Sequence, residues 1–220
     1  MAVLEGGVSA SLAEVGAVAQ KGLHITNKPI DVTGGGYYRV AAQTGTLAAA
    51  LGAGSATVGH LFSFRNPHAS MLVVIHSITV RFQTLTDFTA ATVTDLGFDV
   101  FRLTSFSVVP TTNRTSPTPS KMRTSFGTSV IGATDINVAT TVGMTGQTQT
   151  IDTSPFDSTI ADMNQTSSFP PLSYSPVESL GYPLTLAQNE GFLIRNRGVW
   201  PVAGTGILQA EVSWAEVTAF

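Results

Sequence analysis

The sequence contains no cysteine, which excludes disulfides, cysteine-based zinc sites and thiol catalysis. Charge is also sparse: Asp, Glu, Lys and Arg make up 11% of the 220 residues, against about a quarter in an ordinary globular domain. Two interpretations stay open and are compatible. One is a large β core whose outer faces carry Ser and Thr, and the other is extensive burial against other subunits, since interface cores are depleted of charge.

Long apolar runs and basic clusters are missing as well. The longest apolar runs are short, such as residues 71–75, whereas a transmembrane helix needs about 20 residues. The net charge is −3 and the eleven cationic residues are scattered. Because tracking a phosphate backbone requires a basic patch, the sequence predicts no nucleic-acid partner and no membrane partner.

Residues 1–36 are rich in small side chains and end in three consecutive glycines, which tolerate positive φ. We predict an N-terminal arm joined to the body by this hinge. A short helix over residues 11–20 is possible, because Ser11 and Glu14 have the spacing of a capping box. The remainder, 37–220, is predicted to form a single β-sandwich domain.

Apolar and polar residues alternate in several segments of that domain, as strands with one buried face do. The alternation breaks between Ile75 and Ile78, which predicts a β-bulge there. The predicted strands are 37–40, 61–65, 71–82, 98–104, 183–186, 192–196 and 207–217.

The stretch 110–183 differs in composition. It holds eight of the eleven prolines and long Ser/Thr runs. We interpret it as a long insertion of ordered loops, laid over the body or over neighbours, with short strands possible at 130–131 and 136–142.

One short internal echo is visible, because residues 62–66 resemble residues 192–196 and each precedes a loop and a long strand. It suggests two equivalent hairpins, one in each sheet, as jelly-roll folds provide. The predicted fold class is therefore all-β: a jelly-roll-like antiparallel β-sandwich with an extended N-terminal arm and long Ser/Thr/Pro-rich loops.

Three histidines, His60, His68 and His76, recur every eight residues. A metal site would need their imidazoles to converge, and this spacing around a proline turn does not enforce that. Satisfied surface or cross-strand histidines are the favoured interpretation.

Three aspartates, Asp152, Asp157 and Asp162, recur every five residues in a predicted loop. They could hold Ca²⁺, but the spacing of an EF-hand is missing, and turns and caps are the ordinary use of Asp in such a loop. The segment 52–55 lacks the Lys of a phosphate loop, and no nucleophile elbow or motif-placed triad is present. The sequence therefore predicts no cofactor, no metal and no enzyme.

The two tryptophans have different contexts. Trp214 falls within the last predicted strand and is expected in the core. Trp200 precedes Pro201 in a predicted loop, so a contact with a partner subunit is favoured over stacking on a sugar. The candidate subunit contacts are Leu4, Val8, Leu12, Val15, Leu23, Ile25, Phe156, Phe169 and Trp200.

Four features together resemble the capsid decoration (cement) proteins of tailed bacteriophages. They are the Gly/Ala-rich arm, residues 37–46 with Gln-Thr-Gly-Thr, residues 62–67, and residues 191–197 continuing to Trp214. The resemblance implies a jelly-roll-like homotrimer that binds the major capsid protein on the outside of the shell. It also implies assembly in the host cytoplasm and localisation in the virion. The alternatives are a tail, fibre or receptor-binding module that recognises a host-surface glycan and, less favoured, a glycan-active enzyme.

Overall fold

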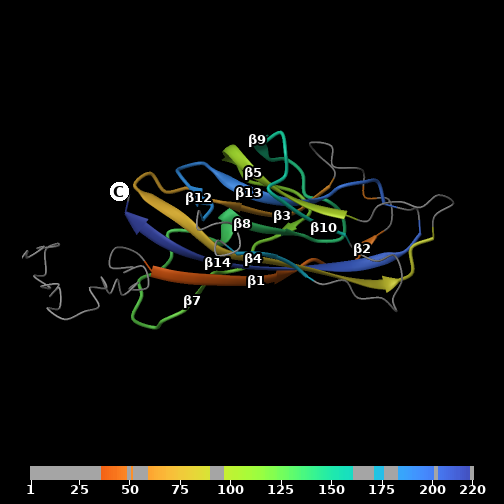
Figure 1. The fold of residues 1–220 in the computed structure, drawn as a ribbon, viewed down its shortest axis with the longest axis horizontal. Coiled ribbons are helices and arrows are strands. Elements are labelled where there is room, and N and C mark those ends of the chain that lie inside the picture. Colours follow the sequence, from red (N-terminus) through yellow and green to blue (C-terminus); the bar gives the residue numbers. More distant parts are fainter. Residues whose placement is uncertain are drawn as a thin grey trace, which may run out of the picture. The chain divides into compact units, whose positions relative to one another are not determined.

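The computed structural model describes residues 36–48, 51, 59–89, 97–160, 171–175, 183–200 and 203–218. These residues form two antiparallel β-sheets packed face to face (Figure 1), and the helical part of the described chain is one 3-10 turn, η1, at Ala133–Asp135. The predicted arm, apart from Gly36, lies outside the described residues. In the described part of the chain, no helix is long and apolar enough to cross a membrane.

The first sheet has the strand order β11-β4-β14-β1-β7, and the second has the order β10-β5-β13-β3-β8-β6. Three further short strands pair with these: β12 pairs with β4, β2 pairs with β14, and β9 pairs with β5. The bounds in the first sheet are β1 Gly36–Gln43, β2 Leu47–Ala48, β4 Met71–Thr86, β7 Ser120–Lys121, β11 Leu172–Tyr174, β12 Thr185–Leu186 and β14 Thr205–Thr218. Those in the second are β3 His60–Arg65, β5 Gly97–Val108, β6 Arg114–Thr115, β8 Ile136–Ala139, β9 Thr148–Ile151, β10 Asp157–Ile160 and β13 Gly191–Asn196.

Eight of these strands form a jelly roll. In chain order they are β1, β3, β4, β5, β10, β11, β13 and β14, and they pair as nested partners: first with last, second with seventh, third with sixth and fourth with fifth. The same order places β1-β14-β4-β11 in one sheet and β3-β13-β5-β10 in the other. This is the eight-stranded double Greek key of jelly-roll domains. The predicted fold class is confirmed.

The two similar segments, residues 62–66 and 192–196, are not placed in the sheets as predicted. Strands β3 and β13 are neighbours in the second sheet, and the strands that follow them, β4 and β14, are neighbours in the first. Each copy thus crosses from one sheet to the other, so the prediction of one hairpin per sheet is wrong. The crossing after β3 is fixed by Asn66, whose Nδ2 donates to the carbonyl oxygens of Met71 and Leu186 at 2.9 and 3.0 Å.

The predicted bulge is confirmed. Ser213 pairs with Ser77 and Trp214 pairs with Ile75, so His76 is the extra residue of β4. Without this insertion, Ile75 and Ile78 could not both face the core, and both are fully buried. The bulge also places the His76 ring against Tyr37, with ring centroids 5.1 Å apart.

Aromatic side chains fill the space between the sheets. Phe64 stacks on Phe192 at 5.4 Å and meets Trp214 edge to face at 5.1 Å. Trp214 is fully buried, as its position in the last strand predicted. Such pairs add about 0.5–1.5 kcal/mol each beyond the area that they bury. This core holds the two sheets at a fixed separation and so defines the two outer faces of the sandwich.

Candidate functional site

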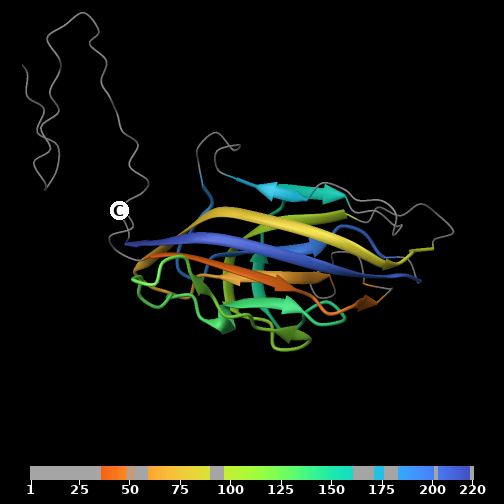
Figure 2. The same ribbon diagram turned by 90° about the horizontal axis from the view of Figure 1, so that it is seen from below.

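The two outer faces of the sandwich are built differently. The second sheet is covered by the chain's own insertion after β5, whereas β4, β14 and β1 of the first sheet run side by side across the face that is turned toward the viewer in Figure 2. The contrast comes from the sequence of the strands. Strand β5 has apolar residues on both faces, and β4 and β14 alternate apolar with polar residues over much of their length.

A second, smaller apolar cluster lies on the outside of β5 and β13. It contains Phe101, Leu103, Phe106 and Leu193, with Val109 and Ile151 packed against them. Ile151 belongs to β9, which is part of the stretch 110–183. The described part of that stretch therefore covers this sheet. It also contributes strands β6 to β11, which include β8 at Ile136–Ala139 but none at residues 130–131.

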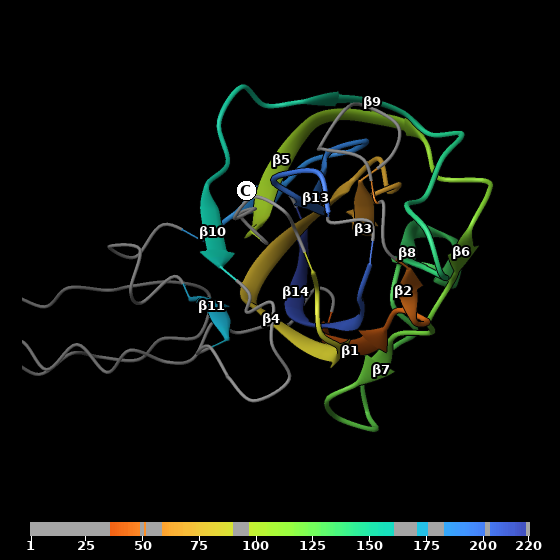
Figure 3. The same ribbon diagram turned by 90° about the vertical axis from the view of Figure 1, so that its right-hand side faces the viewer.

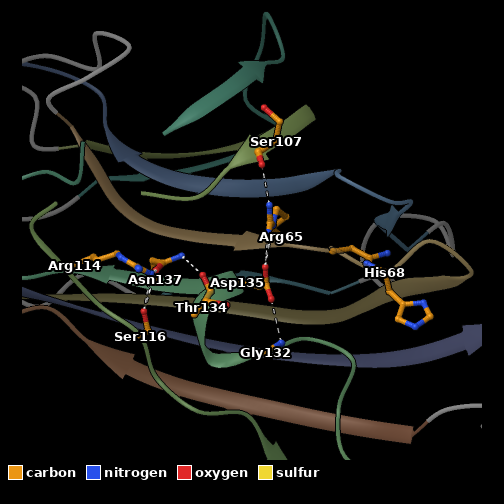
Figure 4. A network of polar contacts seen from close by, with 10 residues as sticks. Arg65, His68, Ser107, Arg114, Ser116, Gly132, Thr134, Asp135 and Asn137 are labelled. Carbon is orange, nitrogen blue, oxygen red and sulfur yellow. Dashed lines mark hydrogen bonds and ion pairs between the residues drawn. The ribbon is translucent and has the colours of Figure 1, made fainter. Parts of the chain in front are cut away.

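An ion pair and several hydrogen bonds connect β3 to the covering segment, the described part of the stretch 110–183 (Figure 4). Arg65 donates from Nε and Nη2 to Oδ1 of Asp135 at 2.9 and 2.6 Å, and from Nη1 to the Ser107 carbonyl at 3.0 Å. The other oxygen of Asp135, Oδ2, accepts the Gly132 N–H at 3.3 Å. Since the Asp135 side chain is only 7% exposed, water screens this pair weakly.

Asn137 continues the same network on β8. Its Oδ1 accepts hydrogen bonds from Arg114 Nη1 at 2.5 Å and from Ser116 Oγ at 3.0 Å, and its Nδ2 donates to the Thr134 carbonyl at 3.1 Å. Asn137 is fully buried, and both polar atoms of its side chain, Oδ1 and Nδ2, therefore have hydrogen-bond partners (Figure 4). The network is a structural fastening, because its polar groups are satisfied by one another.

His60 lies under the same cover. It is 1% exposed, and its Nδ1 contacts the side-chain amide nitrogens of Gln147 and Gln149. Burial, with a smaller contribution from the positive charge of Arg195, lowers the pKa of His60 to about 4. Arg195 faces His60 across the strand pair, and its guanidinium lies 4.0 Å from the centre of the Phe101 ring. His60 is thus neutral at physiological pH.

The outer face of the first sheet is polar and carries three charged residues, Arg39, Arg81 and Glu211. Its cross-strand rows combine small and amide side chains with one exposed ion pair, Arg39–Glu211, whose Nη2 and Oε1 atoms are 3.6 Å apart. Hydrogen bonds link the rows, including Ser77 Oγ to Ser213 Oγ at 2.6 Å. The residues of this face, here called the open face, are Tyr37, Arg39, Ala41, Gln43, Ser77, Thr79, Arg81, Gln83, Ile207, Gln209, Glu211 and Ser213.

A shallow hollow of about 330 Å³ lies in the open face. Ala41, Thr79 and Gln209 are among its lining residues. The hollow exists because Ala41 is short and stands in the β1 row opposite Glu211 of β14. A flat sheet surface with a hollow of this kind can receive a protruding side chain of another protein.

Trp200 is not the surface contact that the sequence predicted. It is 2% exposed and packs edge to face on Phe82, Phe88 and Phe98, at centroid distances of 5.3, 5.2 and 6.0 Å. Its backbone N–H donates to the Leu51 carbonyl at 3.0 Å. The loop after β13 therefore folds inward and closes one end of the sandwich, so neither a partner nor a sugar reaches the ring in this structure.

The remaining predicted contacts divide into two groups. Phe156 is 37% exposed and stands edge to face with Tyr174 at 5.5 Å, so it is accessible to a partner. The others lie outside the described residues: Leu4, Val8, Leu12, Val15, Leu23, Ile25 and Phe169.

The three histidines do not converge. His60 is buried at β3, the His68 Nδ1 accepts the Ser70 N–H at 3.2 Å in a turn, and His76 lies on the open side of β4 beside Tyr37. Burial lowers the pKa of His76 as well.

Asp152 and Asp157 each accept a hydrogen bond from the next residue's N–H, at 3.0 and 2.8 Å, while Asp162 lies outside the described residues. Within the ranges that the structure covers, no three His, Asp or Glu side chains are placed to hold a metal ion.

The sequence interpretation missed the open face, and for the stretch 110–183 it left open whether the loops lie over the body or over neighbours. A signal for the cover was present, because residues 98–106 of β5 carry apolar side chains on both faces, as strands buried on both sides do. Comparison with known proteins adds no further guide to the site: no family model, no curated protein and no solved structure matches the chain.

Proposed function

We propose that the chain is a non-enzymatic virion structural protein that binds the outside of a phage capsid and bridges neighbouring subunits. The observation that carries the proposal is the contrast between the two faces: the chain packs its own insertion on one sheet and leaves a polar open face on the other. The resemblance of the sequence to capsid decoration proteins supports the same role, and so does the jelly-roll topology.

The composition of the open face suits a protein partner. Burying a charge is costly unless it is paired, whereas hydroxyl and amide groups can exchange water for partner groups at little net cost. The apolar atoms of such a contact contribute about 25 cal/mol per Å² before ordering costs. On a shell the contact is repeated many times, so a modest affinity per copy reinforces the particle.

The partners that we propose are the major capsid protein and further copies of this chain, with a trimer as the expected oligomer. Purified phage particles test this assignment. Quantitative mass spectrometry should find the chain in a molar ratio comparable to that of the main shell protein. A handful of copies per particle would instead place it in the tail, as the receptor-binding alternative requires.

A charge placed on the open face tests the surface itself. Ala41→Arg fills the hollow of the open face with a long side chain at an exposed position, so we expect the fold to persist and binding to shells to weaken at least about tenfold, since about 1.4 kcal/mol of lost contact has this effect. Thr104→Arg is the matched control, at an exposed strand position of the other sheet. Equal shell binding by the two variants would rule out the open face as the contact.

Stacking of a sugar on Trp200 is not favoured by the packing of its ring. The ring is 2% exposed and meets Phe82, Phe88 and Phe98 edge to face. Receptor recognition at Trp200 would require the closed end of the sandwich to open.

A further inference from the structure

Strands β10 and β11, one from each sheet, lie close together at one side of the sandwich (Figure 3). A second hollow, of about 330 Å³, lies beside them. Its lining comes from three parts of the chain that are distant in sequence: Arg102 on β5, the turn before β10 with Asp152, Ser154 and Phe156, and Tyr174 with the segment Pro183–Leu184. The volume is at the lower end of the range of small-molecule sites.

Main-chain hydrogen bonds hold these walls in place. Asp152 N–H donates to the Arg102 carbonyl at 3.0 Å, and Phe156 N–H donates to the Val100 carbonyl at 2.9 Å. On the opposite wall, Leu184 N–H donates to Tyr174 Oη at 2.8 Å. The main chain around the hollow is therefore in place before any ligand arrives, which reduces the ordering cost of binding.

The charge of the hollow favours a neutral ligand. Arg102 already pairs with Glu190, at 2.8 Å from Nη2 to Oε1, so an anion would have to compete with a bound carboxylate. Asp152 is the one carboxylate among the described lining residues. A cation would find one exposed carboxylate here and, in the described part of the chain, no group of three acidic or histidine ligands.

Both hydrogen-bond donors and hydrogen-bond acceptors remain available to a ligand in the hollow. The Arg102 side chain is 40% exposed, so its guanidinium offers N–H donors to the hollow beyond the one that pairs with Glu190. Asp152 accepts one N–H, from Thr153, and retains acceptor capacity on its carboxylate. The Ser154 hydroxyl can both donate and accept. Beside them, the partly exposed Phe156 ring offers an apolar surface.

We propose that this hollow is a binding site for a neutral sugar. A sugar ring presents hydroxyls that donate and accept, together with an apolar C–H face, and this combination matches Asp152, Arg102 and Phe156. The hydroxyls would bind the Asp152 carboxylate and an exposed N–H of the Arg102 guanidinium, and the C–H face would pack on Phe156. The site is separate from the open face, and the proposal does not depend on a role in the capsid.

The experiment is titration of the full-length chain with the methyl glycosides of glucose, galactose, mannose and N-acetylglucosamine, followed by NMR and calorimetry. Sodium acetate and sodium phosphate serve as anionic probes. We expect saturable millimolar binding of at least one glycoside. Phe156→Leu and Asp152→Asn should each weaken it roughly tenfold, the effect of losing about 1.4 kcal/mol, while Phe156→Tyr keeps the ring and the affinity.

Met122→Ala is the control, because Met122 is an exposed apolar residue that does not line the hollow. Thermal unfolding of each variant checks the fold. Three outcomes would overturn the proposal: no glycoside saturates at high millimolar concentration, the Phe156→Leu and Asp152→Asn variants bind as the wild type does, or an anion binds in preference to every glycoside.

Discussion

His60, which is buried beneath the segment that follows β5, makes the free energy of unfolding depend on pH within a defined range. His60 has a pKa of about 4 in the folded chain, against 6.5 for an ordinary histidine. Between these values the unfolded chain binds a proton that the folded chain does not. Stability therefore falls as the pH is lowered from about 6.5 to 4, and the loss is complete below the folded pKa.

The size of the loss follows from the two pKa values. They differ by 6.5 − 4, which is about 2.5, and at about 1.36 kcal/mol for each unit of pKa the full effect is about 3 kcal/mol. The cause is structural, because a charged imidazole would lie without water beside the Arg195 guanidinium. A loss of this size is a large share of the stability of an ordinary domain.

The measurement is urea unfolding, followed by the fluorescence of the buried Trp200 and Trp214, at several pH values within the window. His60→Gln is the reference, since glutamine can keep a hydrogen bond to Gln147 or Gln149 and does not titrate. The difference in unfolding free energy between wild type and His60→Gln removes the contributions of carboxylates and of the other histidines. That difference should change by about 3 kcal/mol across the window.

A flat difference would refute the reasoning. So would an NMR titration in which the His60 imidazole of the folded protein takes up its proton near 6.5. Either result would mean that water reaches the ring and that the segment after β5 does not cover it in solution.

Three further changes are expected to destabilise the fold, each measured by urea or thermal unfolding. Trp200→Ala should cost about 3–5 kcal/mol because it empties the closed end of the sandwich, whereas Trp200→Phe should cost less, since the indole Nε1 has no partner among the described residues. Glu216→Ala should cost about 3 kcal/mol, because the N–H of Val130, the indole N–H of Trp214 and the hydroxyl of Ser129 lose their buried acceptor. Gly191→Ala should cost about 3 kcal/mol or more, since its Cβ would stand 2.1 Å from the Phe64 carbonyl oxygen. Values under 1 kcal/mol, which are ordinary for surface changes, would contradict these assignments.

The sequence predicted where the strands lie in the chain better than it predicted which strands pair with each other. Alternation is a local property, so it located β3, β4, β13 and β14 and even the bulge at His76. Pairing is a long-range property, and nothing near β3 indicates that its partner β13 lies more than a hundred residues away. The echo was therefore assigned to two separate sheets, although the jelly roll places both copies side by side.

The error at Trp200 has the same origin. Its neighbours in the sequence indicate a loop, and loops usually run over the surface. Its burial depends on Leu51, which follows β2, and on Phe88, which follows β4. Three loops that are far apart in the sequence meet because the jelly roll brings the ends of their strands to one end of the sandwich. Only the topology, which alternation does not supply, reveals this.

The low charge content now has a partial explanation within the chain itself. An ordinary sandwich exposes two outer faces, but here the segment after β5 buries one of them, and residues such as Phe101 and Leu193 take positions that would otherwise carry charge. This burial does not account for the open face, where Arg39, Arg81 and Glu211 stand among neutral residues such as Ala41, Thr79 and Gln209. The neutral residues at exposed positions of β1, β4 and β14 leave parts of this sheet face without the charges that discourage association. It is this remainder, rather than the overall composition, that argues for a protein partner on the open face.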